Sequence, residues 1–456
     1  MRITGYKTYK PAFCAGKAHV YSDFDGTYCP ARHVSLHNPE LNRDMPEYCS
    51  RMKNLFDTAK DNLHFHITSG RTFGEFDAVF WLLKIRDFRL PLPETYIAKN
   101  GSDVYLKTGS DENFYNKGIF PFSYKITDKQ KEKEIKKLTN WDGANIKSFI
   151  RNLSNKYCIN LIEADTENSV ANYGEKSLFS KGKLNSDEWK KLPYETDGGS
   201  IKFIAHEEPV ADYKIGSRND GNLKTHLIFS PDYGPCSERN WIYDNFMDEL
   251  KNYLKENNIK VHINWQAPGE NNFYRTCCSI TPQIDNKELT KLYDTKKALQ
   301  KAVKNNDLVI VAGDGSNDFN MLNPLEYLDS DYVEHCKKHS AHREFYTQSM
   351  QRRLKDLQAV YNNDNTPYIQ SLKKELETNG ILNKIQKMPL ISIIIKKDKT
   401  KLSLISDTFS GTGKVVVVEK GQLDKGIKEA VKIYAQQNET FKQNMSDDFK
   451  HLIYNN

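Results

Sequence analysis

Short apolar runs alternate with stretches of helical periodicity over the first hundred residues. Residues 19–21, 63–67 and 95–98 have the apolar or alternating pattern of strands, and polar or glycine-containing turns follow them. A helix is predicted over 52–60, and a second helix is indicated after Gly70 by apolar residues at helical spacing. These residues are Phe76, Val79, Phe80 and Leu83. Strands that alternate with helices predict βαβ units and a parallel sheet.

Apolar runs that predict strands occur again much later in the chain. Residues 308–312, 391–395 and 415–418 are almost entirely apolar, which is typical of strands buried on both faces. A helix is predicted after the last of these runs, over 423–435. The separated blocks are expected to form one α/β core, a doubly wound parallel sheet of Rossmann-like type that two insertions interrupt. The expected core blocks are residues 1–106, 278–324 and 389–436.

The two insertions and the tail differ in character. The first insertion, residues 107–277, is long enough to be a domain, and it contains one amphipathic helix with a candidate N-cap at Ser237. The apolar face of this helix comprises Ile242, Phe246, Leu250, Tyr253 and Leu254. The second insertion, 325–388, is polar and is predicted to be helical, with a break at 362–367. The polar tail, 437–456, is expected to be loosely ordered.

Composition narrows the partners and the compartment. The 66 basic and 60 acidic residues leave a net charge of only +6, which argues against a nucleic-acid partner. No window approaches the ~20 apolar residues that a membrane helix needs, and the first residues lack the apolar core of a secretory signal. The 8 cysteines include no CxxC pair, which is typical of reduced thiols. We therefore expect a cytoplasmic protein without a membrane partner, and the oligomeric state stays open.

The strongest chemical signal is the run DFDGT at 23–27, directly after the first predicted strand. Because side chains alternate along a strand, Asp23 and Asp25 are expected on one side of the carboxyl edge, where ligands of open α/β sheets bind. Two carboxylates so close need a cation or a shared proton, and magnesium prefers oxygen ligands of this kind. Taken alone, the same run is also compatible with an ordinary turn.

A second acidic run, GDGSND at 313–318, follows another predicted strand. Asp314 and Asp318 are expected to face the same edge as the first run, so the two runs together predict one magnesium site. Between them in sequence, Thr68-Ser69-Gly70-Arg71 lies at a strand end and leads into a helix. The hydroxyl of Ser69 and free backbone N–H groups there suit a phosphate oxygen, although an ordinary N-cap serine has the same pattern.

The DxDGT, SGR and GDGSND runs, in this order, resemble the first, second and fourth motifs of the haloacid-dehalogenase (HAD) superfamily of phosphatases. Residues 98–101, followed by a long insertion, and the closing run at 419–427 resemble the branch that contains sucrose-phosphate phosphatase and the Cof-type sugar phosphatases. The resemblance implies that residues 107–277 form a large α/β cap that selects the leaving group. It also implies a hydrolase that uses Mg²⁺ and acts on a small phosphorylated substrate, with a sugar phosphate expected.

The resemblance also implies roles for single residues. Asp23 would be the nucleophile that forms an aspartyl-phosphate, and Asp25 would be the general acid and base. Ser69 would bind the transferring phosphoryl group. The expected metal ligands are Asp23, Asp25 through its backbone carbonyl, Asp314 and Asp318, the last either as a ligand or as the partner of one. Further residues expected at the substrate are Gly70, Arg71, Asn100 and Asn317.

The family also needs a phosphate-binding lysine on the helix that precedes the fourth motif. Lys296, expected in the first turn of that helix, is the first candidate, Lys291 is the second and Lys297 is the third. The match is loose, because an ordinary solvated lysine in this lysine-rich helix has the same appearance. Within the expected cap, Trp265, His262 and Asn264 are candidate contacts for a sugar.

Two alternatives to a hydrolase remain open at this point. One is a phosphotransferase, such as a hexose-phosphate mutase, which passes the phosphoryl group to a sugar instead of water. The other is a binding or effector protein of the same fold that acts through residues 325–388. The run Gly411-Thr412-Gly413-Lys414 is not interpreted as a nucleotide-binding P-loop, because its upstream glycine spacing is wrong and a predicted strand follows it.

Overall fold

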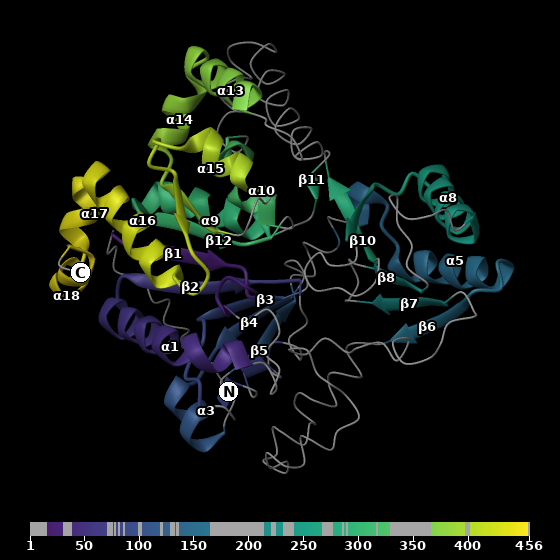
Figure 1. The fold of residues 1–456 in the computed structure, drawn as a ribbon, viewed down its shortest axis with the longest axis horizontal. Coiled ribbons are helices and arrows are strands. Elements are labelled where there is room, and N and C mark those ends of the chain that lie inside the picture. The colour runs from purple at the N-terminus through teal and green to yellow at the C-terminus, as the bar shows by residue number, and fades with distance from the viewer. Residues whose placement is uncertain are drawn as a thin grey trace, which may run out of the picture. The chain divides into compact units, whose positions relative to one another are not determined.

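The protein is an α/β structure with two β-sheets (Figure 1). The larger sheet has the strand order β14-β13-β12-β1-β2-β3-β4-β5, and the smaller has β11-β10-β8-β7-β6, with β9 paired to β10. The computed structural model describes residues 16–30, 39–70, 76, 79–80, 83–84, 87–98, 103–118, 122–127, 133, 136–164, 214–219, 225–230, 241–266, 277–284, 287–288, 291–315, 318–328, 366–396 and 402–454. None of the helices described combines the length and apolar character of a membrane span.

The chain forms two compact units, one of residues 1–28, 51–65 and 294–456 and one of residues 29–50 and 66–293. The strands of the larger sheet are β1 (Ala18–Ser22), β2 (Leu63–Thr68), β3 (Thr95–Ala98), β4 (Asp103–Lys107), β5 (Phe122–Thr127), β12 (Leu308–Gly313), β13 (Leu390–Ile395) and β14 (Val415–Val418). The helices of the first unit and those beside it in sequence are α1 (Pro39–Ala59), α9 (Leu292–Asn305), α10 (Phe319–Leu322), the 3₁₀ turn η5 (Pro324–Tyr327), α13 (Thr366–Thr378), α14 (Ile381–Lys387), α15 (Ser403–Phe409), α16 (Leu423–Gln437), α17 (Glu439–Asn444) and α18 (Asp447–Tyr454).

Helices cover both faces of the parallel strands in the first unit. Strands β1, β12, β13 and β14 pair in parallel, and β12 and β13 are buried along their whole length. The Ser392 hydroxyl donates to the carbonyl of Leu322 in α10 at 2.7 Å. A Cβ added at Gly426 of α16 would lie 2.9 Å from Ile393 Cγ2. Because neighbouring residues of a strand face opposite sides, α10 and α16 lie on opposite faces. The predicted doubly wound α/β fold is confirmed.

The last strand differs from its prediction. Residues 415–418 were expected to be buried on both faces, but Val417 is 46% exposed while Val416 is buried. Strand β14 lies at the end of the strand order and pairs only with β13. A run of four valines therefore indicates a strand, but its neighbours in the sheet decide how much of it is buried.

The C-terminal tail also differs from its prediction. Instead of being loosely ordered, it forms α17 and α18, and the Asn438 side chain caps α17 by accepting from the Phe441 N–H at 3.0 Å. Although the tail is polar overall, it contains apolar residues at helical spacing, and these residues are buried in the core of the first unit. The buried residues of the tail are Phe441, Met445, Phe449, Leu452 and Ile453.

The second unit extends the larger sheet beyond the predicted cap boundary. Strand β3 pairs in parallel with β2, and β4 and β5 continue the sheet in antiparallel order. Strand β5 lies after residue 107, where the cap was predicted to begin, and β10, which begins at residue 277, pairs within the smaller sheet. The larger sheet therefore includes residues as late as 127, and the predicted domain boundaries stay predictions.

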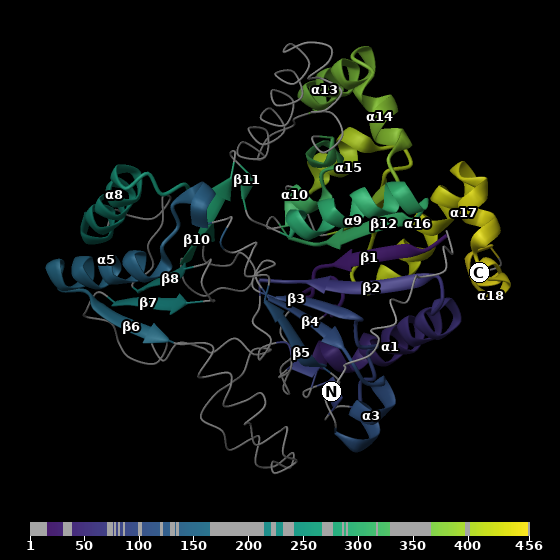
Figure 2. The ribbon, with the colours of Figure 1, turned by 180° about the vertical axis from the view of Figure 1, so that it is seen from behind.

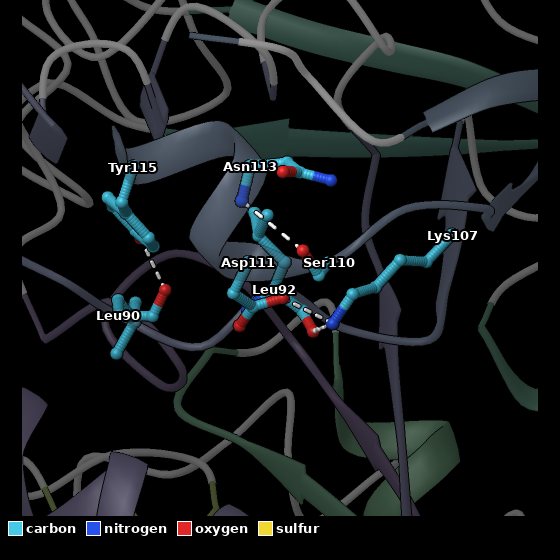
Figure 3. A network of polar contacts seen from close by, with 7 residues as sticks. All are labelled: Leu90, Leu92, Lys107, Ser110, Asp111, Asn113 and Tyr115. Atoms are coloured by element: carbon cyan, nitrogen blue, oxygen red, sulfur yellow. Dashed lines mark hydrogen bonds and ion pairs between the residues drawn. The ribbon is translucent and has the colours of Figure 1, made fainter. Parts of the chain in front are cut away.

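A polar network joins the segment before β3 to helix α3 (Asp111–Lys117), as Figure 3 shows. Asp111 accepts from the Leu92 N–H at 2.9 Å and forms an ion pair with Lys107, whose amine also donates to the Leu92 carbonyl at 3.2 Å. The Tyr115 hydroxyl donates to the Leu90 carbonyl. The pKa of Tyr115 is raised, mainly because the side chain is buried and to a smaller extent because of the charge of Asp111. These contacts fix α3 beside β4 in the second unit.

The smaller sheet is covered by helices on one face (Figure 2). Its strands and helices are β6 (Asn160–Ala164), β7 (Lys214–Asn219), β8 (Thr225–Ser230), β9 (Val261–Gln266), β10 (Cys277–Ile284), β11 (Lys287–Glu288), α5 (Gly143–Lys156) and α8 (Trp241–Glu256). The predicted amphipathic helix is α8, and Phe246 and Leu250 are buried in the core that it shares with α5 and the strands. Its predicted N-cap, Ser237, lies outside the described residues.

Candidate active site

The two acidic runs meet because β1 and β12 are adjacent and parallel. Ser22 is in register with Ala312, and the Asp23 N–H donates to the Ala312 carbonyl at 2.9 Å. Asp23 therefore leaves β1 at the level where β12 reaches Gly313, one residue before Asp314. The carboxyl ends of both strands lie at one edge of the sheet, which is where open α/β sheets bind their ligands.

The structure brings Asp23, Asp314 and Asp318 together. One carboxylate oxygen from each lies within 4.8 Å of the other two. The three residues are 5%, 3% and 0% exposed, respectively, so the negative charges are largely removed from water. Carboxylates at this spacing and burial repel one another unless a cation or protons compensate them. Three oxygen donors in a buried group fit a hard divalent cation such as Mg²⁺.

The second acidic turn is held in place by Asp318 itself. Its Oδ2 accepts from the backbone N–H groups of Asp314 and Gly315, at 3.1 and 3.0 Å. A Cβ added at Gly313 would lie 2.6 Å from both Cβ and Cγ of Asp318, a distance that no side chain tolerates. Gly313 is therefore required for the close approach of Asp318.

The first acidic turn is anchored by aromatic residues. Phe24 and Tyr28 are buried, and the Tyr28 ring lies 4.5 Å from that of Phe65 on β2. The Asp23 carbonyl accepts from the Ser22 hydroxyl at 2.7 Å and from the Tyr28 N–H at 3.2 Å. Gly26 has φ +75°, the left-handed conformation that favours glycine. Phe24 of the DFDGT run is thus buried in the core, while Asp23 belongs to the carboxylate group.

Asp25 and Ser69 are described but are not part of this group. Asp25 is half-buried, and its carboxylate lies outside the group of three. Ser69 is buried directly after β2, in the second compact unit. Its backbone N–H donates to the Ile97 carbonyl at 2.9 Å, which continues the pairing of β2 with β3. The Ser69 N–H thus belongs to the strand ladder, and the role of the Ser69 hydroxyl at a phosphoryl group stays a prediction.

The three candidate lysines differ in burial. Lys291, directly before α9, is 2% exposed, Lys296 is half-buried and Lys297 is exposed. Helix α9 is fixed by the buried hydroxyl of Thr295, which lies 2.9 Å from the Tyr327 hydroxyl of η5. Lysine is rarely buried fully without an anionic partner, so burial distinguishes Lys291 from the other two.

Three predicted substrate contacts lie outside the described residues: Arg71, Asn100 and Asn317. Gly70 is described and half-buried at the end of β2. The run Gly411–Lys414 forms a turn before β14, and its lysine is buried against the carbonyl of Met388 at 2.6 Å. Such a buried lysine is unavailable to a nucleotide, in agreement with the rejection of a P-loop.

Comparisons with known proteins give structural similarities only. No protein-family model matches the chain, and no curated protein matches its sequence. A sucrose-phosphatase from Synechocystis, solved with sucrose and phosphate, is 12% identical, covers 67% of this chain and 78% of its own, and has a TM-score of 0.31. A haloacid dehalogenase-like hydrolase from Bacteroides thetaiotaomicron is 14% identical, with coverages of 67% and 85% and a TM-score of 0.25.

An IMP-nucleotidase from Plasmodium falciparum is also similar, at 13% identity, with coverages of 66% and 60% and a TM-score of 0.28. TM-scores of this size carry no argument about function by themselves. The chain is similar to these solved structures at this level only.

Proposed function

We propose that the protein is a magnesium-dependent phosphohydrolase that cleaves a small phosphomonoester, with a sugar phosphate as the first candidate. The observation that carries this proposal is the buried group of Asp23, Asp314 and Asp318, built from the ends of two adjacent parallel strands. The proposed reaction proceeds through an aspartyl-phosphate on Asp23. The resemblance of the three sequence runs to HAD motifs supports the same chemistry.

The residues present fit a divalent cation. Asp23, Asp314, Asp318 and the backbone carbonyl of Asp25 would hold Mg²⁺. When bound, the ion supplies positive charge next to the oxygens of the phosphoryl group, where the reaction concentrates negative charge. The orientation of Asp318 by two backbone N–H groups would keep one ligand in place before the ion arrives.

The chain's own residues then divide the reaction into two steps. An oxygen of Asp23 attacks phosphorus in line, and the bond from phosphorus to the leaving oxygen breaks. Asp25 donates a proton to that oxygen, and later accepts a proton from the water that attacks the aspartyl-phosphate. Inorganic phosphate leaves and Asp23 is restored. The Ser69 hydroxyl and one lysine bind the phosphoryl oxygens and orient the group.

We assign the lysine role to Lys291 ahead of Lys296, because Lys291 is almost fully buried. The exposed Lys297 is the weakest of the three candidates. Replacement of each by methionine ranks them, since the phosphate-binding lysine should cost far more activity than a solvated one. A larger loss in Lys296→Met than in Lys291→Met would reverse this assignment without changing the proposed reaction.

The deciding experiment is a phosphate-release screen over sugar phosphates, with Mg²⁺ and with a chelator, on the full-length chain. We expect release that requires Mg²⁺ and that Asp23→Asn lowers by roughly 10⁴-fold or more. Activity that survives in Asp23→Asn would exclude the covalent mechanism. Accumulation of a phosphorylated sugar isomer without inorganic phosphate would instead identify a phosphotransferase.

A further inference from the structure

Two buried hydroxyl groups hold helix α10 at its carboxyl end. The Ser392 hydroxyl of β13 donates to the Leu322 carbonyl at 2.7 Å. The Tyr327 hydroxyl of η5 donates to the Met321 carbonyl, also at 2.7 Å. The last carbonyls of a helix have no partner within it, so bonds of this kind fix the position of its end. Because α10 begins directly after Asp318, they also help to hold the second acidic turn.

The same Tyr327 hydroxyl reaches a second helix. It lies 2.9 Å from the hydroxyl of Thr295, near the start of α9, and both residues are buried. A phenol has one proton and Tyr327 donates it to Met321, so Thr295 is the donor in the bond between the two hydroxyls. Burial raises the pKa of Tyr327, which keeps that proton on the phenol. Tyr327 therefore links α9 to α10, which lie next to each other in Figures 1 and 2.

The two ends of this link differ in how they are held. Helix α10 is buried along its whole length, and Ser392 fastens it to β13. Helix α9 is amphipathic, with Leu299 buried and Val303 51% exposed. Apolar packing selects the face of a helix that is buried, whereas a hydrogen bond depends on distance and angle and so also fixes the helix along its axis. The bond between Thr295 and Tyr327 therefore fixes the start of α9 against a firmly held α10.

The predicted phosphate-binding lysine belongs to the region around this bond. Lys296 follows Thr295 directly in sequence, and Lys291 precedes it by four residues. From Asp294 onward, α9 belongs to the same compact unit as the carboxylate group. A catalytic or binding group acts only when it is held at the right distance, and a displacement of about 1 Å can cost roughly 10²-fold in rate. Any residue that fixes the start of α9 is therefore able to control phosphate binding.

We propose that Tyr327 is a positioning residue: its hydroxyl fixes the start of α9, and thereby the phosphate-binding lysine, relative to the acidic turn at Asp318. This inference rests on the proposed phosphohydrolase function and adds to it a residue outside the three sequence runs. The acidic turn is also held by the bonds of Asp318 to two backbone N–H groups and by Ser392. Loss of the Tyr327 hydroxyl should therefore weaken phosphate binding and leave Mg²⁺ binding nearly unchanged.

The test is calorimetric titration of the full-length protein with inorganic phosphate in the presence of Mg²⁺, which needs neither turnover nor a known substrate. Thr295→Val removes the hydroxyl at nearly constant volume, and we expect the Kd for phosphate to rise about 10-fold. Tyr327→Phe removes both bonds and should raise it at least as much. Thr295→Ser keeps the hydroxyl and should retain the wild-type Kd. Titration with Mg²⁺ alone should give nearly the same Kd in all four proteins.

The matched control is Thr408→Val, the same substitution at another buried threonine of the first compact unit. Thr408 lies on α15, and its hydroxyl has no hydrogen-bond partner within the described part of the chain. This variant should leave both Kd values unchanged. Equal phosphate affinity in Thr295→Val and Thr408→Val, with Asp23-dependent release intact, would overturn the inference and leave the proposed function standing. So would a weaker affinity for Mg²⁺ with an unchanged affinity for phosphate, because Tyr327 would then act through Asp318.

A purely structural role of the bond has a different signature. Loss of a buried hydrogen bond lowers the free energy of unfolding, which urea unfolding measures. If Thr295→Val lost stability but bound phosphate with the wild-type Kd, the positioning role would be excluded. Failure of the proposed function is recognised separately, because phosphate release would then persist in Asp23→Asn. A wild-type protein that binds no phosphate in the presence of Mg²⁺ would remove the proposed function and this inference together.

Discussion

The two edges of the parallel strands in the first compact unit differ in how their buried charged side chains are arranged. At the edge where strands begin, Asp307 precedes β12 and accepts from the Lys17 N–H at 3.0 Å, with His19 Nε2 3.6 Å away. Lys414 precedes β14 and donates to the Met388 carbonyl at 2.6 Å. At the edge where strands end, three carboxylates approach one another within 4.8 Å.

This difference separates structural charge from functional charge. Burial by itself raises the pKa of Asp307, but the nearby His19 ring and the hydrogen bond from the Lys17 N–H outweigh it, so the pKa is lowered and the charge stabilises the fold. Like charges gathered at one place cost stability, and such groups are typical of sites where a ligand compensates them. Proximity of like charges, more than burial, therefore distinguishes the edge to which we assign the chemistry.

Among changes that leave every charge in place, the largest effect should come from one that disturbs the carboxylate group. Gly313→Ala places a Cβ 2.6 Å from the Asp318 side chain, so Asp318 or the turn must shift, which we expect to disturb the carboxylate group. Displaced ligand partners typically lower metal affinity 10- to 100-fold, and we expect activity at limiting Mg²⁺ to fall by about 100-fold. Titration of activity against Mg²⁺ concentration measures this effect.

The control for Gly313→Ala is a glycine outside the site at which an added Cβ would also lie less than 3.0 Å from a neighbouring atom. Gly426→Ala places a Cβ 2.9 Å from Ile393 Cγ2, in the packing of α16 against the sheet. Overpacking there should lower the free energy of unfolding by about 1–3 kcal/mol and leave the Mg²⁺ requirement unchanged. If both variants shift the Mg²⁺ titration equally, Gly313 has no special role in positioning Asp318.

At the opposite edge, Lys414→Met should change how stability depends on pH. Burial lowers the pKa of Lys414 from 10.5 to about 8. Between about pH 8 and pH 10.5, the unfolded chain therefore binds more protons than the folded chain. Folding stability therefore rises with pH through this window. Relative to the methionine variant, wild-type stability should gain roughly 2 kcal/mol between about pH 7.5 and 10, as measured by urea unfolding. Parallel pH profiles of the two proteins would contradict this.

The smallest effect is expected from Asp307→Asn. Because the folded pKa of Asp307 is lowered, its stabilisation is complete above the ordinary aspartate pKa and is lost as pH falls through the folded value. We expect the variant to lose about 1 kcal/mol of unfolding free energy at neutral pH, and less in acid. Phosphate release should be unaffected. A loss of activity instead of stability would mean that the two edges are not functionally distinct.

Local patterns predicted most strands of the larger sheet and the broad class of the fold. The apolar runs at 308–312 and 391–395 correspond to β12 and β13, because strands buried on both faces carry no polar alternation. Patterns did not predict that β4 and β5 extend the larger sheet, or that the tail packs as helices. Both depend on hydrogen bonds and burial between segments distant in sequence, to which a window of ten residues is insensitive.

For the candidate site, the sequence by itself determined which residues could carry the chemistry: Asp23, Asp25, Asp314, Asp318 and a choice among three lysines. It did so because carboxylates that follow apolar strands are recognisable one segment at a time. Only the tertiary structure decided that Asp23, Asp314 and Asp318 share a site and that the Ser69 N–H belongs to the strand ladder. Strand order and register set these distances, and both arise from contacts between segments that are far apart along the chain.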